Sequence, residues 1–307
     1  MKNGLTIGIP VYNEEGRIER AIRCAAHQCE KLIVADNAST DGTRSVCEKL
    51  LEQFPNMNYI RHSENIGAIK NWSFIAEKTD TPYLMFLGSH DHIEKDYVGK
   101  VLPALENDAT IEVATGELCF DYDSQTEPVT SYNNWAGGME KSTYARVRAF
   151  LFDRAHLAWC IYGIFRTASF RKYYTDDLPV YGVDIIFLTR MLKLGRCIIV
   201  KGTRYFAWIR NEKCAKTDYL ERVVVKKHAS RQRFQMRNEF RVAEHQAIMD
   251  FFPSASFLKR LGLRFQTMVR FGTFRKPGLD PLFFLLYIPV KLARKFDRAS
   301  RWAQHDN

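Results

Sequence analysis

The chain lacks the cysteine pattern of a disulfide-linked or zinc-binding protein. Its seven cysteines are widely spaced and form no CxxC pair, so we expect reduced thiols in a cytosolic protein. The first residues lack the basic start, apolar stretch and cleavage site of a signal peptide, so secretion is not expected. A long apolar run is also missing, since Pro281–Val290 has about half of the roughly 20 residues that a spanning helix needs.

Acidic residues are scarce in the last third of the 307 residues. Residues 201–307 carry 23 Lys and Arg against 9 Asp and Glu, whereas residues 1–200 carry 22 against 26. The net charge of +10 therefore comes from the C-terminal part. This asymmetry predicts two regions with different partners, a body at 1–215 and a basic helical region at 216–307. The hydrophobic share of 46% suffices for a packed core and excludes disorder.

The C-terminal region combines apolar and basic residues at helical spacing. Residues 257–270 alternate in this way, and Lys291, Arg294 and Lys295 follow the apolar run. We expect an amphipathic element on an anionic membrane surface, which makes the protein peripheral at the inner face of the cell membrane. A helical subdomain packed on the body explains the apolar residues equally well, but not the basic excess. A nucleic-acid-binding tail is not expected, because no reader motif and no interleaving of aromatic with basic residues on a strand is present.

The first 115 residues alternate short apolar runs with longer segments of helical periodicity. This pattern is typical of an α/β fold with a mostly parallel sheet. The predicted strands are Leu5–Pro10, Lys31–Asp36, Met57–Arg61, Tyr83–Leu87 and Ile111–Ala114. The predicted helices are Glu15–Gln28, Thr40–Gln53, Gly67–Lys78 and Asp96–Asn107. Ligands of such sheets bind beyond the carboxyl ends of the strands, and there the sequence is polar.

Four segments around these strand ends carry a family resemblance. They are Ile9–Glu15, Ile33–Thr43, Asn65–Gly67 and Phe86–Asp91. In this order and spacing they resemble the family 2 glycosyltransferases, over about residues 5–100 and more weakly to about 210. The resemblance implies a GT-A fold, which is a Rossmann-like sheet flanked by helices. It also implies inverting sugar transfer from a nucleotide-diphosphate sugar with a divalent cation, Mn²⁺ or Mg²⁺.

The resemblance places the nucleotide-sugar against the first three strand ends. Asp36 matches the aspartate that accepts hydrogen bonds from a pyrimidine base, although Asp36 or Ser39 would also cap the following helix beside an Asp41-Gly42 turn. Pro10, Tyr12 and Glu14 match the nucleotide-contacting first loop. Asn65, Gly67 and Lys70 match the segment under the nucleotide-sugar. Gly67 also suits a tight turn, and Lys70 also suits a solvated surface.

The His90-Asp91-His92 segment departs from the family. Members usually have an Asp-x-Asp or Asp-Asp element here, and this sequence keeps only Asp91, with Gly88 and His90 where other carboxylates stand. The resemblance assigns the metal to Asp91 and a nucleotide-sugar contact to His90, because Mn²⁺ and Mg²⁺ prefer oxygen ligands. A polar turn before the next helix is the alternative. A zinc site from two histidines lacks a third ligand nearby in the sequence.

Asp184 matches the catalytic base of inverting members, and Val183 replaces the glutamate that often precedes it. A carboxylate here would remove the proton of the acceptor hydroxyl. Helix capping is the alternative role of Asp184, and Asp176 and Asp177 are the fallback bases. The segment Ala158–Arg166 resembles the strand on the acceptor side.

Tyr205–Arg210 is predicted as a strand, after which the family often closes a basic segment on the diphosphate. Arg210 is the candidate residue, with Lys213 and Lys216 behind it. The predicted activity is transfer from a UDP-sugar to a glycan or lipid-linked acceptor, in surface polysaccharide biosynthesis. The alternatives are a nucleotide-binding protein of the same fold without transferase activity and, from another class, a nucleic-acid-binding protein.

Overall fold

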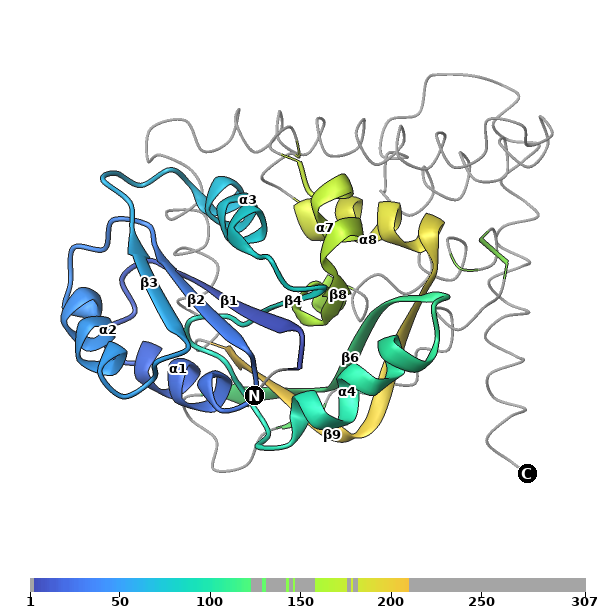
Figure 1. Ribbon diagram of the computed structural model, residues 1–307, viewed down its shortest axis with the longest axis horizontal. Helices are drawn as coiled ribbons and strands as arrows, with labels where there is room; N and C mark the ends of the chain where they lie inside the picture. Colours follow the sequence, from blue (N-terminus) through green and yellow to red (C-terminus); the bar gives the residue numbers. More distant parts are fainter. Residues whose placement is uncertain are drawn as a thin grey trace, which may run out of the picture. The chain divides into compact units, whose positions relative to one another are not determined.

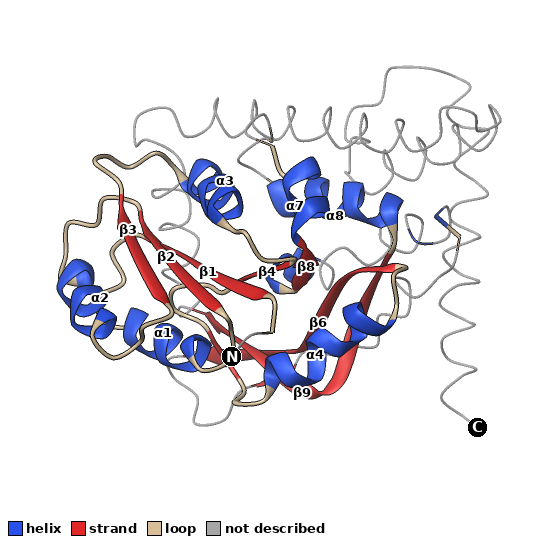
Figure 2. Ribbon diagram, in the orientation of Figure 1, coloured by secondary structure: helices blue, strands red, loops and turns tan. Residues whose placement is uncertain are grey.

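The computed structural model describes residues 3–122, 129–130, 142–143, 146, 158–175, 178 and 182–209. Figures 1 and 2 show them as ribbons. The predicted region 216–307, and with it the membrane-associating segment, lies outside the described residues. Among the helices that are described, none is long and apolar enough to cross a bilayer.

The described strands form one sheet in the order β3-β2-β1-β4-β8-β6-β9-β5, with β7 paired to β6. The strands are β1 (Leu5–Val11), β2 (Lys31–Asp36), β3 (Met57–Arg61), β4 (Tyr83–Phe86), β5 (His92–Ile93), β6 (Ile111–Tyr122), β7 (Val129–Thr130), β8 (Ile164–Arg166) and β9 (Arg196–Ile209). From β3 to β4 all neighbours are parallel. Beyond β4 the sheet is mixed, since β8 runs antiparallel to β4 and β6 while β6 and β9 are parallel.

Helices cover both faces of the sheet (Figure 1). On one face lie α1 (Ile18–Ala26), α2 (Thr43–Leu51) and α4 (Tyr97–Asn107), and on the other lie α3 (Ala68–Lys78), α7 (Thr167–Tyr173) and α8 (Val183–Leu194). Gly8 of β1 explains how closely α3 approaches, because a Cβ there would lie 2.3 Å from Ile75 Cγ2. Ile7 and Ile9 of β1 are fully buried with Ile18 and Ile22 of α1.

The predicted strands and helices of the first hundred residues are confirmed. The strands β2 and β3 have the predicted bounds, and the other predicted elements have shifted ends. The first helix begins at Ile18 instead of Glu15, because the Glu14 carbonyl already accepts the amides of Arg17 and Ile18 in a turn. The predicted strand Ala158–Arg166 is wrong in its first half, where residues Ala158–Tyr162 form a 3₁₀ helix, η2. Gly163 ends η2 and passes so close to β6 that a Cβ would lie 2.8 Å from the Ala114 carbonyl oxygen.

The order of strands reverses beside β1. The chain runs outward from β1 through β2 to β3, and β4 then pairs with the other edge of β1. The carboxyl ends of β1 and β4 therefore border the crevice where open α/β sheets bind ligands. The loops after β1, β2 and β4 all lie at this edge.

Candidate functional site

Three of the predicted contact residues lie at the end of β1 and in the loop that follows it. Pro10 is half-buried within β1, and Tyr12 is 40% exposed. The side chain of Glu14 is only 6% exposed, and its amide donates to Thr43 Oγ1 of α2 at 2.9 Å. Tyr12 thus presents a ring to solvent, while Glu14 lies inside the site.

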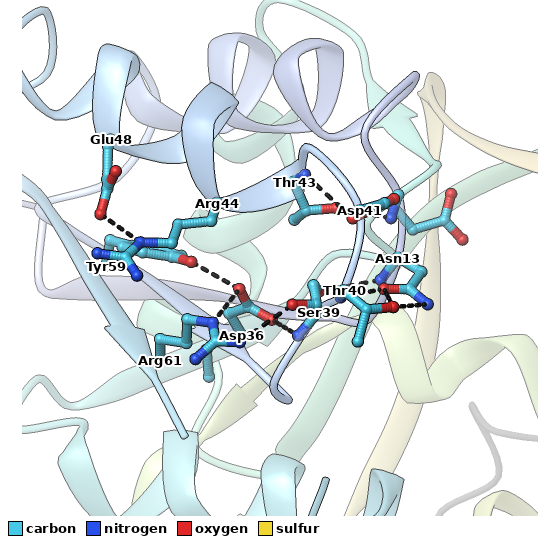
Figure 3. A network of polar contacts seen from close by, with 12 residues as sticks. Asn13, Asp36, Ser39, Thr40, Asp41, Thr43, Arg44, Glu48, Tyr59 and Arg61 are labelled. Atoms are coloured by element: carbon cyan, nitrogen blue, oxygen red, sulfur yellow. Dashed lines mark hydrogen bonds and ion pairs between the residues drawn. The ribbon is translucent and has the colours of Figure 1, made fainter. Parts of the chain in front are cut away.

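Hydrogen bonds connect the loops after β1 and β2 at the carboxyl edge of the sheet (Figure 3). The Asn13 amide donates to Ser39 Oγ at 3.0 Å, and Asn13 Oδ1 accepts from the Thr40 amide at 2.8 Å. The Gly42 amide donates to Glu15 Oε2 at 3.0 Å. The bonds with Ser39 and Thr40 hold Asn13 at a φ of 55°. The paired loops therefore form a preorganised border to the site.

Asp36 is the last residue of β2, and its carboxylate already accepts hydrogen bonds from other groups of the protein. The side chain is fully buried, Oδ1 accepts from the Ser39 amide at 2.8 Å, and Oδ2 accepts from the Tyr59 hydroxyl at 2.6 Å (Figure 3). Arg61 Nε lies 3.7 Å from Oδ2. Burial, together with the bond to Asp36, raises the pKa of Tyr59 well above its ordinary value. The N-cap of α2 is Gly42 and receives no side-chain cap bond, so the alternative in which Asp36 or Ser39 caps this helix is wrong. The base contact of Asp36 stays a prediction.

Asn65 and Gly67 reach the same edge from the start of α3. Asn65 Oδ1 accepts from Asn37 Nδ2 at 2.7 Å and from the Gly67 amide at 2.9 Å. Gly67 has a φ of 86°, which a side chain would disfavour, and the space around its Cα is open. Lys70 is exposed on the first turn of α3. Asn65 thus links α3 to the end of β2 beside the crevice.

Asp91, in the loop after β4, is the most enclosed of the predicted site residues after Asp36. Its side chain is 2% exposed, Oδ2 accepts from the Tyr205 hydroxyl at 2.6 Å, and Oδ1 accepts from the Trp208 amide at 2.8 Å. A Cβ on Gly88 would lie 2.2 Å from Oδ2, so the carboxylate packs against the backbone of its own loop. Burial raises the pKa of Asp91.

His90 lies between two carboxylates. Its Nδ1 is 3.2 Å from Glu14 Oε1, and its Nε2 is 3.8 Å from Asp91 Oδ1. The ring is 32% exposed and meets Trp208 edge-on at 5.4 Å. The structure therefore brings together Glu14, His90 and Asp91, which the sequence separates by up to 77 positions.

Four residues that contact the site were not predicted from the sequence: Arg17, Arg20, Tyr205 and Trp208. The guanidinium carbon of Arg17 lies 3.8 Å above the Trp208 ring. Arg20 donates to the His90 carbonyl and to Asp121 Oδ2, both at 3.2 Å. Arg17 and Arg20 follow the end of the first motif at Glu15 by two and five residues, and this proximity was the available signal. Nothing near Tyr205 in the sequence indicates that it holds Asp91.

Asp184 is the second residue of α8. Gly182, with a φ of 74°, is the N-cap, so the alternative in which Asp184 caps this helix is wrong. Burial raises the pKa of the Asp184 carboxyl. Tyr162 of η2, which packs against α8, stacks on Tyr205 with ring centroids 5.4 Å apart. Arg210, Lys213, Lys216, Asp176 and Asp177 lie outside the described residues.

Comparison with known proteins now decides the family. The model of Glycosyl transferase family 2 matches residues 6–174, which include every motif at the crevice described above. The chain belongs to glycosyltransferase family 2. Its fold is the GT-A arrangement that the sequence resemblance implied.

Relatives of this family 2 chain include two proteins of Bacillus subtilis (strain 168). The minor teichoic acid biosynthesis protein GgaA is 25% identical over 224 residues, which cover 69% of this chain and 49% of GgaA. The uncharacterized glycosyltransferase YfnE is 32% identical over 109 residues, which cover 34% and 28%. The chain thus spans about half or less of these curated relatives.

Solved structures of S. aureus TarS share the fold. The crystal structure of TarS 1-349 superposes with a TM-score of 0.59 at 16% identity, covering 88% of this chain and 72% of that one. The structure of TarS 1-349 in complex with UDP-GlcNAc gives 0.57 at 17% identity, covering 82% and 73%. At this identity the likeness concerns the fold alone.

The divalent cation implied by the family resemblance does not fit the described geometry. A hard cation needs a carboxylate oxygen that it can reach, whereas the Asp91 side chain is 2% exposed and each of its oxygens already accepts one protein hydrogen bond. Within the described ranges no group of three or more His, Cys, Asp and Glu side chains is arranged to hold a metal. The metal role of Asp91 therefore has no support from these contacts.

Proposed function

We propose that this chain is an inverting glycosyltransferase that moves a sugar from a UDP-sugar to a glycan or lipid-linked acceptor. The observation that carries this proposal is the family 2 match over residues 6–174, whose motif residues lie together at the switch in strand order. The name of GgaA and the UDP-GlcNAc complex of TarS support a role in surface polysaccharide biosynthesis and a UDP-sugar donor.

The donor fits along the edge from β3 to β4. The exposed ring of Tyr12 and the side chains of Asn65 and Asp36 border the half of the crevice beyond β1 and β2, where we place the base. Glu14 and His90 border the half beyond β4, where we place the diphosphate. Lys70 of α3 and the predicted Arg210 supply cationic side chains near the donor. This order follows the strand ends and leaves the α8 side for the acceptor.

Asp184 is the general base of the proposed reaction. The acceptor hydroxyl oxygen forms a bond to the anomeric carbon while the bond from that carbon to the diphosphate oxygen breaks. The electron pair of the broken bond stays on the diphosphate, and the hydroxyl proton moves to the Asp184 carboxylate. Attack from the face opposite the leaving group inverts the anomeric carbon. The raised pKa of Asp184 increases its affinity for this proton.

The proposed acceptor and the proposed membrane contact are argued from the charge distribution of the chain and from its relatives. The last 107 residues hold the basic excess, which suits an anionic membrane surface where lipid-linked acceptors reside. We place the protein in the cytoplasm, peripheral at the inner face of the cell membrane. The predicted Mn²⁺ or Mg²⁺ cofactor stays a prediction, and the enclosure of Asp91 speaks against it.

A donor screen followed by a turnover assay tests this function. We expect UDP-GlcNAc or another UDP-sugar to raise the melting temperature of the purified protein, because a ligand that binds only the native state stabilises it. Release of UDP in the presence of a polysaccharide precursor should then be lost in Asp184→Asn. Stabilisation without turnover on any acceptor would favour the non-catalytic nucleotide-binding alternative. No response to any nucleotide-sugar would contradict the proposal.

A further inference from the structure

In the loop after β4, the imidazole of His90 is exposed, whereas the carboxylate of Asp91 is buried. Asp91 is 2% exposed and holds two hydrogen bonds from β9, whereas His90 is 32% exposed. The two ring nitrogens of His90 face Glu14 and Asp91 at 3.2 and 3.8 Å. The imidazole therefore fills the space in which a cation would bridge these two carboxylates.

Two arginines lie beside this loop, both at the start of α1. Arg17 is 34% exposed, 4.0 Å from Glu14 Oε2 and stacked over Trp208. Arg20 is 46% exposed and contacts the His90 carbonyl and Asp121. The Arg20–Asp121 pair is partly exposed, at 46% and 25%, and such pairs contribute little to stability, so exchanging Asp121 for another anion costs little. A guanidinium binds phosphate oxygens in a bidentate manner, which a carboxylate partner does not prevent.

We infer that Arg17 and Arg20 neutralise the diphosphate of the donor, and that the β4 loop uses no divalent cation. This inference rests on the proposed function. When the bond between the anomeric carbon and the diphosphate oxygen breaks, the electron pair remains on that oxygen, and the guanidinium groups stabilise the added charge. His90 keeps the carboxylates of Glu14 and Asp91 apart from the diphosphate.

Binding of UDP with and without metal tests the first half of the inference. Calorimetry on the full chain should give the same Kd, within about twofold, in EDTA and in MnCl₂. Binding that appears only with Mn²⁺, or tightens about tenfold or more with it, would overturn the inference and leave the proposed function standing. Absence of UDP and UDP-GlcNAc binding in both buffers would instead contradict the proposed function.

Substitution of the arginines tests the second half. Arg17→Gln and Arg20→Gln should each weaken UDP binding about tenfold or more, since each removes a charge-assisted contact, and should leave uridine binding unchanged. Arg17→Lys keeps the charge but loses the planar guanidinium that can donate two parallel hydrogen bonds, so we expect a Kd for UDP between those of the wild type and Arg17→Gln. Arg23→Gln is the matched control, because Arg23 lies on the same helix, is 44% exposed and pairs with Glu19. Wild-type affinity for UDP in both glutamine variants would overturn the assignment.

Discussion

Asp36 and Asp91 show that a buried carboxylate can have a structural role at a binding crevice. Asp36 ends β2, and Asp91 lies in the loop after β4. Each is almost completely buried, and each accepts a tyrosine hydroxyl at 2.6 Å, from Tyr59 and Tyr205. Buried carboxylates must be hydrogen-bonded, and these two are bonded inside the protein. They shape the loops that border the crevice, and our proposal places more exposed neighbours such as His90 on the donor side.

Asp184→Asn separates catalysis from stability at the residue scale. Asparagine keeps the size of the side chain but cannot accept the proton, so we expect turnover to fall about 10²- to 10⁴-fold with unchanged UDP binding. Because the pKa of Asp184 is raised in the folded protein, the folded state binds the proton more tightly. The ionised form therefore costs stability as pH rises from the ordinary value of 3.8 through the raised one.

Thermal melts across pH check this prediction. At neutral pH the melting temperature of Asp184→Asn should equal or exceed that of the wild type, and the difference should shrink as the pH approaches 3.8. Turnover near the wild-type value in a less stable variant would contradict the role of base.

Ala38 offers a second prediction at this scale. It has a φ of 61°, a left-handed conformation that costs an alanine roughly 1–2 kcal/mol. Ala38→Gly should therefore stabilise the protein by up to about 1 kcal/mol, after the added freedom of the unfolded chain, and raise the Tm by up to about 2 °C. Ala104→Gly, inside α4, is the control and should lose about 1 kcal/mol. Equal losses in both variants would contradict the conformation of Ala38.

At the scale of elements, hydrogen bonds from β9 hold the loop after β4 in its conformation. Tyr205 and Trp208, three positions apart on this strand, hold the two oxygens of Asp91 from the side chain and from the backbone. The Tyr205 hydroxyl also accepts the Gly88 amide at 3.2 Å. The loop shape thus depends on a strand that follows it by more than a hundred residues.

Tyr205→Phe tests this dependence. Removal of the hydroxyl leaves a buried carboxylate oxygen and a buried amide without this partner, so we expect a loss of about 1–3 kcal/mol in the free energy of unfolding. UDP binding should weaken as well, because the β4 loop loses its anchor. Tyr83→Phe in β4 is the control, since its hydroxyl lies outside these contacts. Denaturant melts that do not distinguish the two variants would contradict the anchoring role.

At the scale of the whole molecule, charge divides the chain. The described body carries the crevice, and the basic excess falls in residues 201–307. Truncation before residue 255 should therefore abolish sedimentation with anionic vesicles, and binding of the full chain should weaken as salt rises. Phosphatidylcholine vesicles are the control surface. Equal sedimentation of full and truncated protein with anionic vesicles would contradict the membrane contact.

The sequence by itself determined the elements of the first hundred residues and the polar segments at their ends. Periodicity and turn residues act locally, so β2 and β3 have the predicted bounds, and the GT-A resemblance follows from motifs that lie within single loops. Tertiary packing alone decided which side chains of those motifs face the crevice. Asp91 is internal because Tyr205 and Trp208 arrive from β9, and Arg17 and Arg20 join the site because α1 packs beside the β4 loop. Burial and hydrogen-bond partners depend on contacts between distant segments, and no local pattern encodes them.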